Sequence, residues 1–401
     1  MPAKTVRLEH EDPFLARFDA RVVAHASFAG RPSVVLDRSA FYPESGGQLA
    51  DHGRLGGARV VDVQIDEGGA VHHLLEDGAP LPALGEAIAG EVDRVRRRLH
   101  MSLHTGQHML SRALVDVASA ETASSRLGES ACTIDVVAGA TLDERAVGRA
   151  EDLVNAVIDD DVAIRAYFPS DAELAALPLR RAPKVTENVR VVSIGEFDVT
   201  PCGGTHCVRS AQVGLLRVTA LERYKGSMRV TFSAGPRARR ELSVHDEALR
   251  SLARSLTCAP TDVAQALERV RRELETTREG LGRARSVLAQ AAAEDLWSDA
   301  ERVGDPHVIA AFDEGGVEFL RAVSARLVTK PRAVALLAMR SPDGVHVLVD
   351  RATDSGFDCG GFVKMLASKS GGRGGGRVDH AEGRLPVGVD WAALVRGLLA
   401  S

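Results

Sequence analysis

The segment His104-Thr-Gly-Gln-His108 decides how the fold of this sequence is interpreted. Two histidines four residues apart lie on one face of a helix, about one turn from each other. The residues around them, 93–120, repeat leucine near the helical period. We therefore predict a helix that is anchored by its leucines and that turns both histidines toward a cleft.

A second pair of metal-binding residue types comes nearly a hundred residues later, in Cys202-Gly-Gly-Thr-His206. Its glycines allow the backbone to turn sharply, so both side chains can converge. The two pairs together supply three imidazole nitrogens and a thiolate, a donor set suited to Zn²⁺. Cys207 is an alternative thiolate, although neighbouring residues rarely reach the same side. Four protein ligands close a tetrahedral site, so catalysis would need one position to open, and the sequence alone leaves this undecided.

Composition narrows the function classes. Of the 401 residues, 45% are apolar and 26% are charged, and the net charge is −5. These values exclude a wholly disordered chain and a globally basic nucleic-acid binder, but they leave room for a local basic face. The five cysteines are scattered, and neither a signal peptide nor an apolar run of about 18 residues is visible. We expect a cytoplasmic protein with no membrane segment.

The pattern of the chain predicts an α+β multidomain protein with four parts. Short β-branched runs broken by turns predict a small β-barrel domain in residues 1–92. Residues 93–242 mix helices and strands and form an α+β domain that carries the candidate metal site. Residues 243–302 are a charged helical spacer with a narrow apolar seam, either a coiled-coil hairpin or a solvated helix. Residues 303–401 return to alternating strands and helices, which predicts a C-terminal α/β domain.

Two glycine-rich segments lie outside the metal-binding pairs. FYPESGGQLADHG, residues 41–53, contains the pair Gly46–Gly47, which favours a tight turn at positive φ. The tract Gly360–Gly383 is either a flexible linker or a folded element whose glycines allow close approach of RNA and whose cations meet phosphates. Its cations are Lys364, Lys369, Arg373 and Arg377.

Arginines form two further groups. As single residues they are expected on solvated helix faces, but as groups near the candidate site they could hold the phosphates of an RNA stem. The first group comprises Arg94, Arg96, Arg97 and Arg98, and the second comprises Arg237, Arg239 and Arg240.

Four segments in order resemble the editing half of alanyl-tRNA synthetases, namely FYPESGGQLADHG, HTGQHMLSRAL, TPCGGTH and SGGRGGGRVDHAEG. The sequence is similar above all to the free-standing long alanyl-tRNA editing proteins, which carry no aminoacylation domain. The resemblance covers nearly the whole chain. It implies a small barrel, a zinc-bearing deacylase domain, a helical spacer and a C-terminal domain that binds tRNA and oligomerises, with a homodimer as one outcome. The residues after Cys202 and the VDH of the last segment depart from the family pattern, which affects fine RNA contacts more than the class.

The resemblance also implies roles for single residues. The two histidines of the first pair and the cysteine and histidine of the second match the zinc ligands of the family. Gln107 lies where the family places a polar residue beside the second histidine, and Ser124 and Ser125 fall near a side chain that reads or positions the aminoacyl group. The implied reaction is hydrolysis, in trans, of the ester that joins serine or glycine to a tRNA for alanine.

This chemistry fits the residues. An aminoacyl ester is already activated, so a held substrate, a positioned water and a polarised carbonyl suffice. No Ser-His-Asp order or obvious nucleophilic cysteine supports a covalent route. Two alternatives stay open: zinc-dependent editing of another mischarged tRNA, and a zinc-stabilised tRNA-binding protein without turnover. A phosphoesterase is disfavoured, because the sequence has no upstream aspartate-rich metal cluster.

Overall fold

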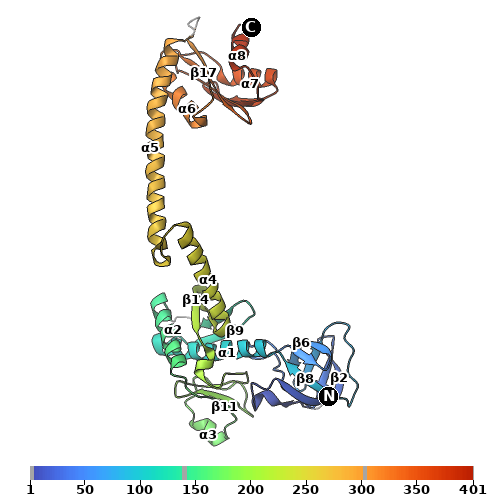
Figure 1. Cartoon of the computed structure of the whole chain (residues 1–401). Helices are drawn as coiled ribbons and strands as arrows, with labels where there is room; N and C mark the ends of the chain where they lie inside the picture. Colours follow the sequence, from blue (N-terminus) through green and yellow to red (C-terminus); the bar gives the residue numbers. More distant parts are fainter. Residues whose placement is uncertain (1–3, 138–141, 301–304, 401) are drawn as a thin grey trace. The chain divides into compact units, whose positions relative to one another are not determined.

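The chain forms two compact units, Met1–Arg250 and Ser251–Ser401. The computed structural model describes residues 4–137, 142–300 and 305–400 (Figure 1). Both units combine helices with sheets, which confirms the mixed α and β multidomain class predicted from the sequence. The expected boundaries at residues 92 and 242 fall inside the first unit, and the boundary at residue 302 lies outside the described residues. The four-part division therefore stays a prediction.

The first unit begins with a closed β-barrel, at the place where the sequence predicts one. Strand β8 and the first half of β2 bury every second side chain, so one face of each strand packs into the barrel core. The strands follow the order β2 (Arg17–Phe28), β3 (Arg31–Leu36), β7 (Val71–Leu75), β6 (Ala58–Ile65), β5 (Gly53–Leu55) and β8 (Ala87–Val92). Two short strands, β1 (Val6–Arg7) and β4 (Arg38–Ser39), pair in parallel, and the 3-10 helix η1 (Leu8–His10) follows β1.

The glycine pair Gly46–Gly47 forms the tight turn that the sequence predicts. Both residues have positive φ, 59° and 87°, a conformation that glycine adopts without steric cost. Ser45 and Gln48 close the turn with two backbone hydrogen bonds. A Cβ at Gly47 would lie 2.8 Å from the backbone oxygen of Ser125, so the turn packs directly against strand β9 (Thr122–Leu127). This contact carries Gln48 out of the barrel toward the candidate metal site.

Helix α1 (Arg94–Ala118) is the element on which the first unit is assembled, and it coincides with the predicted helix. Asp93 caps its first turn by accepting hydrogen bonds from the backbone N–H groups of Val95 and Arg96. Ser119 ends it in the left-handed conformation. Every residue from His100 to Ser111 is buried, because neighbouring elements cover the helix on all sides there. The histidines at 104 and 108 therefore sit in the interior of the unit.

Two sheets complete the first unit around α1. One has the order β14 (Leu216–Tyr224), β15 (Ser227–Ala234), β10 (Cys132–Val136) and β9 (Thr122–Leu127), and the other has the order β11 (Ile164–Tyr167), β12 (Val191–Ile194) and β13 (Asp198–Pro201). The remaining helices are α2 (Glu144–Asp159), α3 (Asp171–Ala176), the 3-10 helix η2 (Ser210–Val213) and α4 (Gly235–Ser255). Because β13 ends one residue before Cys202, the second sheet presents the second metal-binding pair to α1.

The predicted helical spacer contains the end of α4, the 3-10 helix η3 (Pro260–Asp262) and the long helix α5 (Val263–Ser298) (Figure 1). Only Ala266, Ala289 and Ala293 are buried along α5. The leucines of its apolar seam are exposed at intervals of seven residues, at Leu267, Leu274, Leu281 and Leu288. Most of α5 is thus a solvated helix that keeps a heptad seam. No helix in the described ranges is both long and apolar enough to cross a membrane.

The second unit contains a five-stranded sheet with helices on both faces. Ala289 and Ala293 of α5 share a core with α6 on one face, and α7 and α8 pack on the other face. The strand order is β16 (His307–Phe312), β17 (Val334–Ser341), β18 (Gly344–Arg351), β20 (His380–Leu385) and β19 (Arg373–Gly376), and the helices are α6 (Gly316–Leu327), α7 (Cys359–Ser370) and α8 (Trp391–Leu399).

The glycine-rich tract Gly360–Gly383 is a folded element and not a linker, since it includes most of α7 and the edge strand β19. A Cβ at Gly374 would lie 2.6 Å from a methyl group of Val363, so this glycine lets α7 pack tightly on the sheet. The tract's four cations, Lys364, Lys369, Arg373 and Arg377, are all exposed. Packing inside the domain therefore accounts for Gly374, while the cations remain accessible to a partner.

Candidate metal centre

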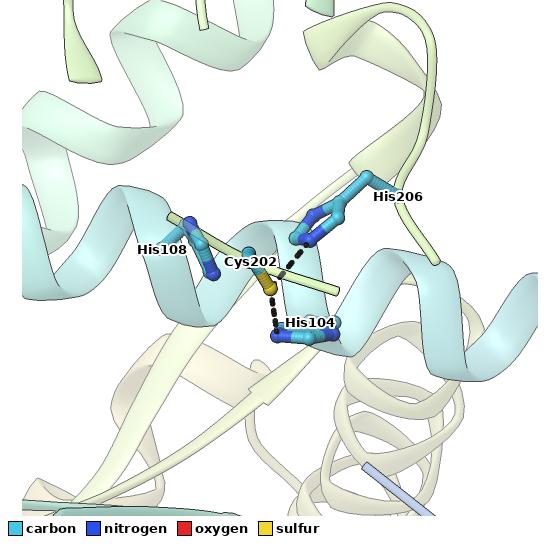
Figure 2. Close-up of side chains that lie close together, drawn as sticks. All are labelled: His104, His108, Cys202 and His206. Atoms are coloured by element: carbon cyan, nitrogen blue, oxygen red, sulfur yellow. Dashed lines mark hydrogen bonds between the residues drawn. The ribbon is translucent and has the colours of Figure 1, made fainter. Parts of the chain in front are cut away.

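Four side chains from the two predicted pairs converge on one point inside the first unit. His104 and His108 project from α1, and Cys202 and His206 come from the loop after β13 (Figure 2). One ligand atom from each of the four lies within 4.8 Å of the others. Sγ of Cys202 is 3.4 Å from Nε2 of His104 and 3.3 Å from Nε2 of His206. The sequence prediction that these residues meet is thus matched by the geometry, and three imidazoles with a thiolate suit a tetrahedral metal ion.

The ring of His104 is held by the barrel. Its Nδ1 is 2.7 Å from Oε1 of Gln48, so the Nε2 atom faces the cluster. The same Gln48 oxygen accepts a hydrogen bond from the backbone N–H of Thr205, and Nε2 of Gln48 donates one to the Thr205 hydroxyl. One glutamine therefore fixes a ligand on the helix and the loop that carries the other pair, as partners behind metal-binding histidines do.

The other two histidines have partners of their own. Nδ1 of His206 lies 3.3 Å from Oγ1 of Thr105, which also accepts the backbone N–H of Cys207. Nδ1 of His108 lies 3.7 Å from a carboxylate oxygen of Asp198, and that buried carboxylate is paired with Arg180. In each case the second ring nitrogen remains for a metal ion.

The loop between Cys202 and His206 owes its shape to Gly204 and Arg190. A side chain at Gly204 would overlap the ring of His104, so only glycine fits. The buried guanidinium of Arg190 donates hydrogen bonds to the backbone oxygens of Cys202 (3.1 Å) and Gly204 (2.8 Å). These contacts hold the second pair in the conformation that faces α1.

The environment favours a thiolate surrounded mostly by neutral imidazoles. Burial raises the pKa of Cys202, but the three histidines outweigh burial and hold the net pKa well below its usual value. Burial and the neighbouring His104 lower the pKa of His206 to about 3, and burial also lowers the pKa of His104. Burial opposes protonation of His108 as well, yet the thiolate and Asp198 raise its pKa. A thiolate beside neutral imidazoles is the form in which these residue types bind a metal ion.

The cluster opens into a cavity of about 620 Å³. His104 and Cys202 reach this cavity, and Arg181, Lys184 and Arg190 also line it. None of the described residues that line the cavity carries a carboxylate. In a chain with a net charge of −5, this local excess of positive charge is suited to an anionic ligand.

The three residues expected to read or position the aminoacyl group all line the cavity. Gln107 is buried, and its side-chain N–H donates to Oγ of Ser111 at 2.8 Å. Ser124 donates its hydroxyl to Asp135 and is therefore already engaged. Ser125 lies beside the Gly47 turn on β9. Their roles remain predictions.

Three sequence-based alternatives are wrong. Arg97, from the first arginine group, is buried and forms an ion pair with Asp51 of the barrel, so it cannot contact RNA phosphates. Arg237, from the second group, is buried and donates to the backbone oxygen of Gly128. Cys207 lies outside the cluster, and burial raises the pKa of its thiol, so it is not the alternative ligand.

The sequence interpretation missed Gln48 and Thr105 as partners of the histidines. Both lie within the quoted segments FYPESGGQLADHG and HTGQHMLSRAL, so the signal was a polar residue in each motif without an assigned role. Asp198 and Arg190 lie outside those segments, and no spacing in the sequence relates them to the site.

We predict that Gln48→Leu weakens zinc binding by about 10- to 100-fold, because His104 loses the acceptor that orients its ring. Competition with a fluorescent zinc chelator measures this affinity. Gln64→Leu, in strand β6 of the same barrel, is the matched control and should bind zinc as the unmodified chain does. Equal affinities for all three proteins would contradict the role of Gln48.

Comparison with known proteins finds similarity to alanyl-tRNA editing proteins and to alanine–tRNA ligases. The family described as the threonyl and alanyl tRNA synthetase second additional domain matches residues 189–231, which include Cys202 and His206. The alanyl-tRNA editing protein AlaX-L of Pyrococcus horikoshii is 30% identical over 388 residues, which cover 94% of this chain and 94% of that protein. The alanine–tRNA ligase of Pyrococcus furiosus is 30% identical over 390 residues, 95% of this chain but only 42% of the ligase. Among solved structures, the C-Ala domain of Aquifex aeolicus alanyl-tRNA synthetase is 22% identical, with a TM-score of 0.23, and the match covers 25% of this chain and 93% of that one.

Proposed function

The chain belongs to the family of alanyl-tRNA editing proteins, and from this premise we propose that it hydrolyses mischarged alanine tRNA in trans, with a zinc ion in the His104–His108–Cys202–His206 cluster. The substrate is tRNA(Ala) that carries serine, with glycine as a second candidate. The reaction cleaves the ester between the aminoacyl group and the terminal ribose, and water is the second reactant.

One observation carries the proposal: a four-ligand cluster at the wall of a cationic cavity. The aminoacyl ester of a tRNA lies next to phosphodiester groups, so its pocket needs a group that acts on the ester beside groups that tolerate negative charge. The cluster supplies the first, and the absence of carboxylates among the described lining residues supplies the second.

Different residues of the chain have different roles in the proposed reaction. A zinc ion held by the four ligands would supply a Lewis acid that polarises an ester carbonyl or lowers the pKa of a water molecule. Arg190 keeps the loop of Cys202 in place, and Gln48 orients His104. Gln107 offers a polar contact for a serine hydroxyl within the cavity. Alanine has only a methyl group there, so a site that pairs the hydroxyl can hydrolyse serine esters and spare alanine esters.

Deacylation assays on the full chain test this proposal. We expect rapid hydrolysis of serine-charged tRNA(Ala), little hydrolysis of alanine-charged tRNA(Ala), and loss of activity with a zinc chelator that is reversed by added zinc. Equal cleavage of the two charged tRNAs would contradict the proposal. Hydrolysis of a different mischarged tRNA, or tRNA binding without turnover, would instead support one of the two alternatives that the sequence leaves open.

The exposed cations of the C-terminal tract are proposed to recruit tRNA, and a homodimer through the same domain remains part of the proposal. We predict that Lys364→Gln, Lys369→Gln and Arg373→Gln together weaken tRNA binding and lower the salt dependence of log Kd by up to about 0.9 per lost phosphate contact. Filter binding at several salt concentrations measures both quantities. Hydrolysis of a short acceptor hairpin should persist, and its loss in the folded triple variant would contradict a role limited to recruitment.

A further inference from the structure

An aromatic pair lies at the cavity, apart from the metal ligands. Phe168 follows strand β11 and His10 ends η1, and their ring centroids are 5.7 Å apart with a tilt of 54°. Both residues line the cavity. Phe168 is 53% exposed, so its ring is accessible to a ligand in the cavity. Burial, together with Arg7 and Arg190, lowers the pKa of His10 to about 3, so its ring is uncharged at neutral pH.

Two cations lie on the segment 177–190, between α3 and β12, which also borders the cavity. Arg181 is exposed, yet its guanidinium donates to the backbone oxygen of Pro201, the residue before the ligand Cys202. Lys184 is exposed three residues further on. No carboxylate among the described lining residues competes for either cation.

We propose that the exposed ring of Phe168, held in place by its tilted contact with His10, stacks on the terminal adenine of the tRNA, and that Arg181 and Lys184 bind the last phosphodiester groups of its 3′ end. This subsite rests on the proposed function, because it assumes that the ester delivered to the metal cluster is the 3′ ester of an RNA. It assigns the adenosine end to one side of the cavity and leaves Gln107 for the amino acid.

The chemistry of the ligand selects these residues. A single-stranded RNA end presents a flat base and one negative charge per nucleotide, and proteins bind such ends with an aromatic face and nearby cations. Every tRNA has the same terminal adenosine, so a stacking contact without base-edge recognition is sufficient. Arg181 can bind a phosphate close to the ester, because its hydrogen bond to Pro201 holds its charge next to the cluster that would act on the ester.

The test uses the full chain and an uncharged acceptor hairpin whose terminal adenine is replaced by 2-aminopurine, a fluorescent base that is quenched on stacking. We expect quenching by the unmodified chain. Phe168→Leu, which keeps an apolar side chain but no ring, should abolish the quenching and raise KM for the charged hairpin by about tenfold. Phe168→Tyr should restore both. Quenching by Phe168→Leu equal to that of the unmodified chain would overturn the stacking assignment.

The cations are tested in parallel. Arg181→Gln and Lys184→Gln should each weaken hairpin binding and lower the salt slope by about 0.7, the value for one phosphate of a single strand. Arg149→Gln, on the exposed surface of α2 and outside the cavity, is the matched control and should change neither. Salt slopes that stay at the unmodified value in the Arg181 and Lys184 variants would overturn the phosphate assignment.

The outcome for the subsite is separable from the outcome for the proposed function. Quenching that depends on Phe168, in a protein that deacylates no tRNA, would leave the subsite in place and reject the editing reaction. Deacylation that is unchanged in the Phe168, Arg181 and Lys184 variants would support the editing reaction and reject the subsite. Zinc content serves as the internal check and should be unchanged in all these variants, because none of the substituted residues belongs to the metal cluster.

Discussion

His108→Ala is expected to leave less than one zinc ion per chain and to lower kcat/KM for serine-charged tRNA(Ala) by about 10³-fold. His108 is buried, and its ligand atom is one of the four that converge among the described residues, so alanine leaves three donors in the cluster. Asp198, the carboxylate beside His108, keeps its partner Arg180. The expected loss is therefore one of metal binding more than of folding.

Elemental analysis of the purified protein gives zinc per chain, and circular dichroism shows whether the variant is folded. His245→Ala, an exposed histidine on α4, is the control and should retain full zinc and activity. Cys202→Ser, which nearly preserves the side-chain volume, repeats the test if His108→Ala does not fold. A folded His108→Ala protein with one zinc per chain would refute the ligand assignment.

The four residues of the cluster could be predicted from the sequence because their geometry is mostly local. A separation of four residues on a helix places His104 and His108 on one face whatever the rest of the chain does. Cys202 and His206 are likewise joined by a short loop whose glycines restrict its shape. Only the meeting of the two pairs is a tertiary fact, and the chemical complementarity of the four side chains was enough to suggest it.

The partners of the ligands could not be predicted in the same way. Gln48 reaches His104 across 56 residues and Thr205 across 157, and these contacts depend on how the barrel docks on α1. The arginine run before the histidines illustrates the same limit. Arg97 faces the barrel and pairs with Asp51, whereas Arg98 next to it is exposed, and the sequence does not reveal which side of the helix the barrel covers.

The barrel, helix α1 and the C-terminal sheet were predictable because their apolar periodicities differ clearly from one another. The glycine-rich tract was harder to interpret. Gly374 is required by the close approach of Val363, yet a glycine that serves packing is identical in the sequence to one that serves a ligand. The heptad seam of α5 can be seen in the sequence, but the sequence does not show that the seam is exposed to solvent.

Gln107→Met is expected to narrow the preference for serine over alanine while zinc content stays near one per chain. In the structure the Gln107 amide contacts Ser111, and no hydrogen bond joins it to a described metal ligand. Gln107 also lines the cavity, so its amide can meet a serine hydroxyl there. A site that pairs a hydroxyl can reject the analogue without it by as much as ~10⁴-fold, because the polar group of the site is then left unpaired.

The measurement is the ratio of kcat/KM for serine-charged and alanine-charged tRNA(Ala), taken together with zinc content. Methionine matches the size of glutamine but removes the polar group, so the ratio should fall chiefly through slower hydrolysis of the serine ester. Gln265→Met, on the exposed surface of α5, is the control and should leave the ratio unchanged. If zinc content and both rates fall together while the ratio stays constant, Gln107 supports the neighbouring histidine and does not read the amino acid.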